Sequence, residues 1–309
     1  MIIIPQLSSF YWIFMKIIEV EHTPLDLREY RMRSALESDF TPTNLIKESC
    51  VLVDKTTGKQ LVIYKDLDDE GFDSGELSMA LQSINYQVGT RVSGLVTTSR
   101  IFGYSPRVPL RKDFCSVTSL AEDNPKAHSL LCEYGRKVVD LYSEIAPETY
   151  EAHLSSTEKK VRKEYQIEGT PFTSGIVNKN NPLKYHFDSG NFKDVYSCML
   201  GIRRNVAGGY LALPEYDCAL EIKNNSVTIF DGQKILHGVT PMKLLSDDAY
   251  RFTIVYYSLT RMWACLPIGE EIARIRNVKT ARERKRATGV AEEEVATGSA
   301  ELEAFKDVR

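Results

Sequence analysis

The sequence changes character at TPFTSGIVN (170–178), the first of eight short segments that are rich in β-branched and aromatic residues. The seven that follow are KYHFD (184–188), VYSCMLGI (195–202), GYLALPEY (209–216), CALEI (218–222), SVTIFD (226–231), ILHGVT (235–240) and YRFTIVYYSL (250–259). Strands at this spacing, separated by polar or glycine-bearing breaks, are typical of a jelly-roll or barrel and argue against a parallel sheet with crossover helices. We therefore predict an α+β fold whose core is a double-stranded β-helix (jelly-roll).

The chain before this core predicts strands first and helices second. Residues 16–115 contain short strand patterns, such as VLVDK (51–55) and QLVIYKD (60–66). A helix is expected to begin after Asn124, because a proline follows it in the first turn, and apolar residues then recur at steps of three and four up to Ile145.

These patterns divide the chain into three regions. A second, more polar helix is expected between 148 and 165. From residue 266 onward the sequence is polar and helix-prone, then basic, then acidic. We predict an N-terminal strand, loop and helix region (1–165) packed against the core, the core itself (166–265), and a C-terminal helix with a charged tail (266–309).

Composition places the chain among ordinary globular proteins. Of its 309 residues, 43% are hydrophobic and 26% are charged, and the net charge of −3 gives no general attraction to nucleic acid or to acidic membranes. The apolar first eighteen residues lack a basic n-region and are interrupted by Pro5, so we predict neither a signal peptide nor a membrane anchor. Met15 is an alternative start. The expected location is cytoplasmic, or nuclear in a eukaryotic host, and the sequence does not indicate an oligomeric state.

The six cysteines are scattered along the chain and include no C-x-x-C pair. Their spacing therefore favours neither a structural zinc site nor a disulfide framework, and we expect reduced thiols.

One segment carries two metal-ligand side chains in a strand pattern. His186 and Asp188 are two residues apart in KYHFD, so a strand would place both on one face. His237 lies 49 residues after Asp188, in a later predicted strand. Two imidazoles and one carboxylate form the facial triad of non-haem Fe(II) oxygenases, which leaves iron positions open for a co-substrate and for O2. We therefore predict an iron site at these three residues, which are also the catalytic candidates.

A cation in the last strand of the core complements this triad. Arg251 follows His237 by 14 residues in YRFTIVYY, where alternate side chains would point into the barrel. Its guanidinium is suited to bind the distal carboxylate of 2-oxoglutarate in a bidentate fork. Thr253, on the same strand face, would add a hydroxyl group. The expected cofactor set is Fe(II), 2-oxoglutarate as co-substrate, and O2.

Residues 170–257 resemble the TET and base J (thymine hydroxylase) branch of the Fe(II)- and 2-oxoglutarate-dependent dioxygenases. The resemblance lies in GTPFTSGIVNKNNPLKYHFDSGN, AGGYLALPEY, FDGQKILHGVTP and YRFTIVYYS. It implies the same iron ligands and the same arginine anchor, and it adds Asn178 as a residue that assists co-substrate binding; alternatively, this asparagine caps the turn that follows it. It also implies hydroxylation of a methyl group, in thymine or in 5-methylcytosine, within DNA.

A DNA substrate would need basic side chains along its phosphates and a pocket for an extruded base. The basic candidates are Arg100, Arg107, Arg111 and Lys112, together with the segment 274–286. The candidates for the pocket walls are Tyr185, Phe187 and Phe192, each of which could equally belong to the core. Two alternatives remain open: a hydroxylase of a small molecule or a protein side chain, and a non-catalytic barrel that binds nucleic acid or a partner.

Overall fold

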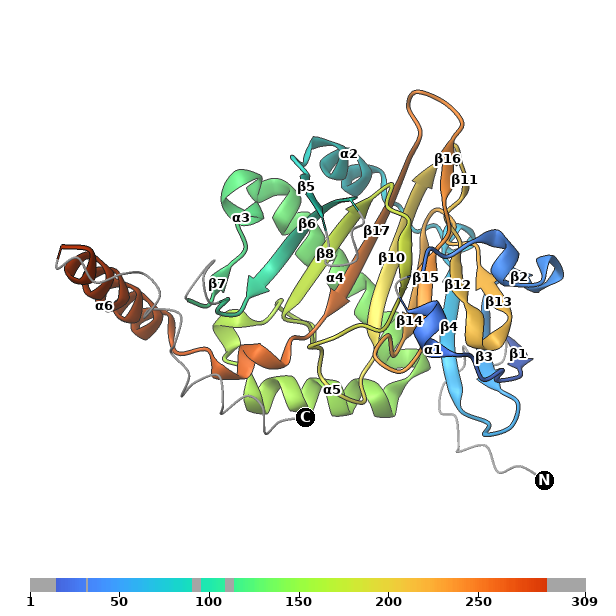
Figure 1. Cartoon of the computed structure of the whole chain (residues 1–309), viewed down its shortest axis with the longest axis horizontal. Coiled ribbons are helices and arrows are strands. Elements are labelled where there is room, and N and C mark those ends of the chain that lie inside the picture. Colours follow the sequence, from blue (N-terminus) through green and yellow to red (C-terminus); the bar gives the residue numbers. More distant parts are fainter. Residues whose placement is uncertain (1–14, 32, 91–95, 109–113, 288–309) are drawn as a thin grey trace.

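The computed structural model describes residues 15–31, 33–90, 96–108 and 114–287, which form two β-sheets with helices around them (Figure 1). The larger sheet has the strand order β1-β3-β4-β14-β10-β17-β8-β6-β5, with β7 paired to β6. The smaller sheet has the order β2-β13-β12-β15-β9, and β11 pairs with β16 in a separate ribbon. An apolar core joins the two sheets, with Met199 and Val62 from the larger sheet packed in one cluster with Leu211 and Val239 from the smaller.

The strand bounds follow the predicted segments closely within the core. Those before the core are β1 (Lys16–Val20), β2 (Leu45–Ile46), β3 (Cys50–Asp54), β4 (Gln60–Asp66), β5 (Gln87–Thr90), β6 (Val96–Ser105) and β7 (Ser116–Val117). Those of the core are β8 (Ser174–Lys179), β9 (Leu183–His186), β10 (Ser197–Arg204), β11 (Val206–Gly208), β12 (Leu211–Leu213), β13 (Cys218–Leu220), β14 (Ser226–Phe230), β15 (His237–Val239), β16 (Met242–Leu244) and β17 (Tyr250–Tyr257).

The topology confirms the predicted double-stranded β-helix. Strands β8, β10, β14 and β17 lie together in the larger sheet, and β9, β12, β13 and β15 lie in the smaller one. The chain therefore passes back and forth between the two sheets, and neighbours within a sheet come from distant parts of the sequence. This winding pairs the end of β9 with the start of β15, and it pairs Asn191, in the loop after β9, with Leu259, which follows β17.

The helices lie mainly before the core. They are α1 (Leu27–Tyr30), α2 (Gly75–Ser83), α3 (Leu120–Asp123), α4 (Pro125–Ile145), α5 (Pro147–Lys160) and α6 (Ile268–Ala287). Helix α4 begins after Asn124, as the sequence predicted, and the Asn124 side chain caps it by accepting a hydrogen bond from the Ala127 amide. The second predicted helix ends earlier than expected, at Lys160, and the sequence did not predict α2 or α3 within the first region.

Helix α4 determines which side of β17 faces the barrel. Tyr256 donates a hydrogen bond to the Leu131 carbonyl of α4 (2.8 Å), and Phe252 and Ile254 belong to the same apolar cluster as that helix. Because side chains alternate along a strand, the odd-numbered residues Arg251 and Thr253 point the other way, between the two sheets.

The N-terminal region extends both sheets of the core. Strands β4 and β6 pair with β14 and β8 in the larger sheet, and β2 pairs with β13 in the smaller. At the far end of the molecule, α6 projects away from the body (Figure 1). Among the described residues, no helix is long and apolar enough to cross a membrane.

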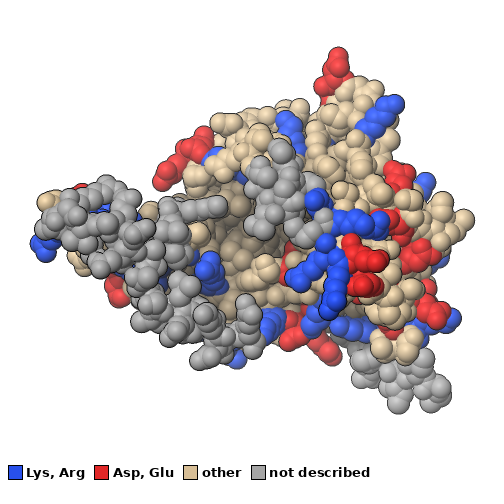
Figure 2. All heavy atoms as spheres, in the orientation of Figure 1, with Lys and Arg blue, Asp and Glu red and all other residues tan. Residues whose placement is uncertain are grey.

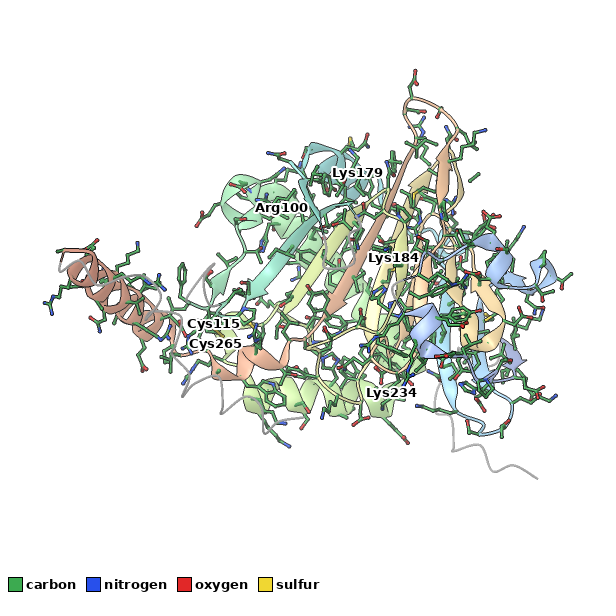
Figure 3. All side chains as sticks on the ribbon, in the orientation of Figure 1. Arg100, Cys115, Lys179, Lys184, Lys234 and Cys265 are labelled. Atoms are coloured by element: carbon green, nitrogen blue, oxygen red, sulfur yellow. A yellow bond between two sulfur atoms is a disulfide. The ribbon has the colours of Figure 1, made fainter. Side chains whose placement is uncertain are left out.

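One cysteine prediction is wrong. Cys115 and Cys265 form a disulfide, and they lie together near the start of α6 (Figure 3). The two residues are 150 positions apart, so only the fold brings them together and no local spacing indicates it. The other four cysteines are free thiols, and none is fully exposed.

Candidate metal centre and co-substrate pocket

Two histidines of the predicted triad are direct neighbours across the smaller sheet. His186 ends β9 and His237 begins β15, and the two residues are partners in the antiparallel register. Their ring centroids are 4.4 Å apart. Phe230, from the larger sheet, packs its ring edge-on against His237 at 5.1 Å, which holds this imidazole from the barrel side.

Backbone carbonyls determine which ring nitrogens face the site. Nδ1 of His186 lies 2.8 Å from the carbonyl of Lys184, and Nδ1 of His237 lies 2.9 Å from the carbonyl of Ile235. A carbonyl only accepts, so each Nδ1 carries the proton and donates it. Each Nε2 then presents a lone pair, which is the state in which a neutral imidazole binds a metal.

Asp188 completes the cluster from the loop after β9. Its Oδ1 lies 3.8 Å from His186 Nε2 and 3.9 Å from His237 Nε2. One ligand atom from each of the three residues falls within 4.8 Å of the other two, so the cluster could hold a single metal ion. The side chains of His186 and Asp188 are about a quarter exposed, at 26% and 28%, whereas that of His237 is 7% exposed. The cluster is therefore open to incoming molecules on one side.

Gly232 makes room for the Asp188 carboxylate. Its carbonyl accepts a hydrogen bond from the Asp188 amide at 2.8 Å. A Cβ atom at position 232 would lie 2.2 Å from Asp188 Oδ2 and 3.3 Å from His237 Cε1. Any side chain here would displace a candidate metal ligand, and sequence reasoning did not single out this glycine.

Arg251 is a buried cation with two guanidinium nitrogens that make no hydrogen bond among the described residues. The residue is 1% exposed, and its Nε and Nη2 atoms have no partner within the described part of the chain. Burial, together with the nearby Arg203, lowers the pKa of Arg251 to about 9, so the guanidinium is still charged at neutral pH. A buried, charged group without acceptors is costly, and an anion bound in the pocket would remove that cost.

The residues beside Arg251 on the barrel face are polar. Thr253 is the next residue on this face of β17, and the register places Asn178 of β8 directly opposite Thr253. Both are buried, at 4% and 5% exposure. The Oδ1 atom of Asn178 lies 3.4 Å from Nδ2 of Asn181, which is a weak contact. The structure thus brings the three predicted co-substrate residues onto one surface inside the barrel.

Comparison with known proteins identifies the domain that carries this site. A family model described as the oxygenase domain of the 2OGFeDO superfamily (Tet_JBP) matches residues 107–260, which include all six site candidates. The structure supplies the corresponding fold and an arrangement of His, Asp and Arg side chains suited to that class. Residues 107–260 are a Tet_JBP oxygenase domain.

Similar proteins share this segment and are much longer. The thymine dioxygenase JBP1 of Leishmania major is 30% identical over 122 residues, which cover 39% of this chain and 14% of that protein. The bifunctional helicase and thymine dioxygenase JBP2 of Leishmania braziliensis is 30% identical over 190 residues, covering 60% and 16%. Among solved structures, NgTET1 in complex with 5mC DNA aligns with a TM-score of 0.49 and 16% identity, covering 73% of this chain and 86% of that one.

Of the basic residues predicted to contact DNA, those between 100 and 112 are not shown by the structure to be available for phosphate contacts. Arg100 is wrong as a phosphate contact: it is 6% exposed and its guanidinium is bound to Asp123 and Ser119 (Figure 3). Arg107 is engaged by Glu271 of α6. Arg111 and Lys112 lie outside the described residues.

The segment 274–286 lies on α6, which extends from the oxygenase domain (Figure 1). Glu271, 1% exposed, anchors the start of this helix by accepting hydrogen bonds from the Leu266 and Cys115 amides at 2.9 and 3.2 Å. The disulfide and the Arg107–Glu271 ion pair join the same two stretches of chain. Beyond this root, Arg276, Lys279, Arg282 and Arg284 are exposed along the helix.

Two aromatic candidates for the pocket walls belong to the core. Tyr185 and Phe192 are 0% and 2% exposed and pack in separate apolar clusters. Tyr185 donates a hydrogen bond to Asp39 (3.0 Å), and its backbone amide donates to the Arg33 carbonyl, so it joins β9 to the N-terminal segment. Phe187 is half-buried against the same cluster.

Proposed function

We propose that this chain is an Fe(II)- and 2-oxoglutarate-dependent dioxygenase that hydroxylates the methyl group of thymine or 5-methylcytosine in DNA. One observation carries the proposal: a His-Asp-His cluster and a buried, unpartnered arginine lie in the same barrel, within a Tet_JBP domain. The chain spans only about a seventh of the length of the relatives named above, so we assign their activity to it as a proposal.

The donor set fits iron. His186, Asp188 and His237 offer two imidazole nitrogens and one carboxylate oxygen, the set that leaves open positions in non-haem Fe(II) oxygenases. When bound, Fe(II) with 2-oxoglutarate and O2 supplies an oxidative decarboxylation that drives hydroxylation of a C–H bond. The protein holds each imidazole by its Nδ1 hydrogen bond and keeps Asp188 in the space left by Gly232.

The pocket at Arg251 fits a dicarboxylate. Its two unpartnered nitrogen atoms, Nε and Nη2, form one edge of the guanidinium fork, which matches both oxygens of a carboxylate. Thr253 and Asn178 would supply a hydroxyl and an amide along the rest of the chain of 2-oxoglutarate, on the way from Arg251 toward the metal cluster. In this arrangement Arg251 fixes the distal end of the co-substrate and the barrel walls exclude water from it.

The open face beside the site is suited to an apolar ring. The strand register places Ile101, Ile176 and Val255 in one row across β6, β8 and β17. Ile101 is 44% exposed, although it is a large apolar side chain on a strand that pairs with β8. Figure 2 shows a recess near the centre of this side of the molecule. A base extruded from the duplex would find an apolar floor there for its ring and methyl group.

Nucleoside analysis tests the function directly. The purified protein is incubated with Fe(II), ascorbate, 2-oxoglutarate and DNA with or without 5-methylcytosine, and the digested nucleosides are measured by mass spectrometry. We expect hydroxymethylated thymine or cytosine and one succinate per hydroxyl group introduced. Succinate formation without any new nucleoside would favour the alternative, a hydroxylase of a small molecule or a protein side chain. Absence of both would contradict the dioxygenase itself.

Helix α6 is the proposed contact for DNA phosphates. The exposed Arg and Lys side chains of α6 lie away from the body of the domain, where they could contact the phosphates of a DNA strand. We expect a variant with Arg276, Lys279, Arg282 and Arg284 changed to Gln to bind DNA more weakly. The slope of log affinity against log salt should fall by about 1 for each lost phosphate contact. Fluorescence anisotropy at several salt concentrations measures both quantities. An unchanged slope would exclude α6 from the DNA interface.

A further inference from the structure

A second arginine lies directly behind the co-substrate anchor. Arg203 of β10 is the register partner of Arg251 in β17, so the two side chains lie on the same barrel face. Arg203 donates hydrogen bonds to the carbonyls of Ile222 (3.0 Å), Gly208 (3.3 Å) and Val206. All three acceptors are neutral carbonyls, so these contacts bring no negative charge to Arg203, and the Glu221 carboxylate offsets its positive charge only in part.

These hydrogen bonds hold strand β11 and the glycine pair at its end, which lies against Arg251. Gly208 and Gly209 both have positive φ, at 72° and 70°, a conformation that favours glycine. A Cβ atom at Gly209 would lie only 3.0 Å from Cδ and Nε of Arg251. Arg203 therefore holds the Val206–Gly208 backbone, and that backbone places Gly209 against the guanidinium of Arg251.

The charge of Arg203 also acts on the pocket. Two cations on paired strands repel each other, and this repulsion contributes, after burial, to the lowered pKa of Arg251. An anion bound at Arg251 relieves the repulsion and is attracted by both guanidinium groups. The attraction is larger for a ligand whose distal end is charged than for one whose distal end is a methyl group.

We propose that Arg203 is a positioning residue for the co-substrate: it orients Arg251 through the backbone of residues 206–209 and adds a second positive charge that selects 2-oxo acids with a distal carboxylate. The proposal rests on the proposed function, which identifies the anion as 2-oxoglutarate. Arg203 itself is committed to backbone carbonyls, so it acts through Arg251 and the electrostatic potential of the pocket.

The test measures binding without turnover. Wild type, Arg203→Met and Arg203→Lys are loaded with Mn(II) under anaerobic conditions and titrated with 2-oxoglutarate or with 2-oxopentanoate, which lacks the distal carboxylate. Arg204→Met is the matched control, because Arg204 is the next residue on β10 but its side chain is 59% exposed and pairs with Asp248.

We expect Arg203→Met to raise the Kd for 2-oxoglutarate roughly tenfold or more, in proportion to the lost charge. The Kd for 2-oxopentanoate should change less than twofold, and Arg204→Met should match wild type. If Arg203→Met does not fold, Arg203→Lys provides the test. Lysine keeps the charge but cannot make all three carbonyl contacts. Its Kd for 2-oxoglutarate should therefore lie above that of wild type and below the value expected for Arg203→Met. The role of Arg203 would be overturned if the affinities for 2-oxoglutarate and 2-oxopentanoate fell equally, or if neither variant bound 2-oxoglutarate more weakly than wild type. Failure of wild type to bind 2-oxoglutarate would instead contradict the proposed function.

Discussion

Replacing Asp188 or His237 with alanine is expected to abolish iron-dependent conversion of 2-oxoglutarate to succinate. Each change removes one of three candidate ligand atoms that lie within 4.8 Å of one another. Loss of a group that merely supports a metal ligand costs about 10- to 100-fold in affinity or activity. Loss of a ligand itself should therefore lower iron affinity by more than ~100-fold and reduce succinate formation to background.

The measurement combines anaerobic iron titration with a succinate assay at saturating Fe(II). Asp248→Ala is the matched control, since Asp248 is an exposed aspartate that pairs with Arg204 at 2.8 Å. Circular dichroism and thermal unfolding check that each variant is folded. Iron-dependent succinate formation by either variant, at a rate near that of wild type, would show that these residues do not hold the metal.

The predictable part of the site came from strand periodicity. His186 and Asp188 are two residues apart, and Arg251 and Thr253 are two apart, so the period of a strand places each pair on one face before any fold is known. The eight segments of the core predicted the barrel, and the family resemblance implied that His186, Asp188 and His237 are the iron ligands. What the sequence could not supply was the register that makes His186 and His237 direct partners.

The same periodicity could have corrected the prediction for Arg100. Arg100 and Phe102 are two residues apart on β6 and therefore face the same side. Phe102 packs with Tyr256 on the helix-covered side of the sheet, at 5.3 Å between ring centroids. Arg100 consequently points toward α3, where Asp123 binds it, and away from the open face. The apolar Phe102, two residues after Arg100, is the feature of the sequence that indicates a buried position for Arg100.

Other features depend on contacts between distant segments and have no local signal. The Cys115–Cys265 disulfide joins a residue of the N-terminal region to the last residue of the predicted core, just before α6. Gly209 and Gly232 matter because Arg251 and Asp188 approach their Cα atoms, which only the folded chain reveals. The double glycine in AGGYLALPEY is part of the family resemblance, and the approach of Arg251 to Gly209 gives the second glycine a physical reason.

Replacing Arg251 with methionine is expected to weaken 2-oxoglutarate binding while making the ligand-free protein more stable. The guanidinium is 1% exposed, charged at neutral pH and without a partner at two nitrogen atoms. Removing an unpaired buried charge relieves a desolvation cost in the ligand-free state. In the bound state the same change removes a bidentate, charge-assisted pair, which amounts to about 3–4 kcal/mol or a roughly 100- to 1,000-fold rise in Kd.

Thermal unfolding with and without 2-oxoglutarate separates these two effects. A ligand at 100 times its Kd stabilises the folded state by about 2.7 kcal/mol, so wild type should show a clear rise in Tm that Arg251→Met lacks at the same concentration. Arg251→Lys keeps a charge but not the fork, and it should recover only part of the shift. A purely structural role for Arg251 predicts the opposite sign in the ligand-free protein, a lower Tm for Arg251→Met. Only an arginine whose role is to bind the ligand should lower the stability of the ligand-free protein and raise that of the protein with 2-oxoglutarate bound.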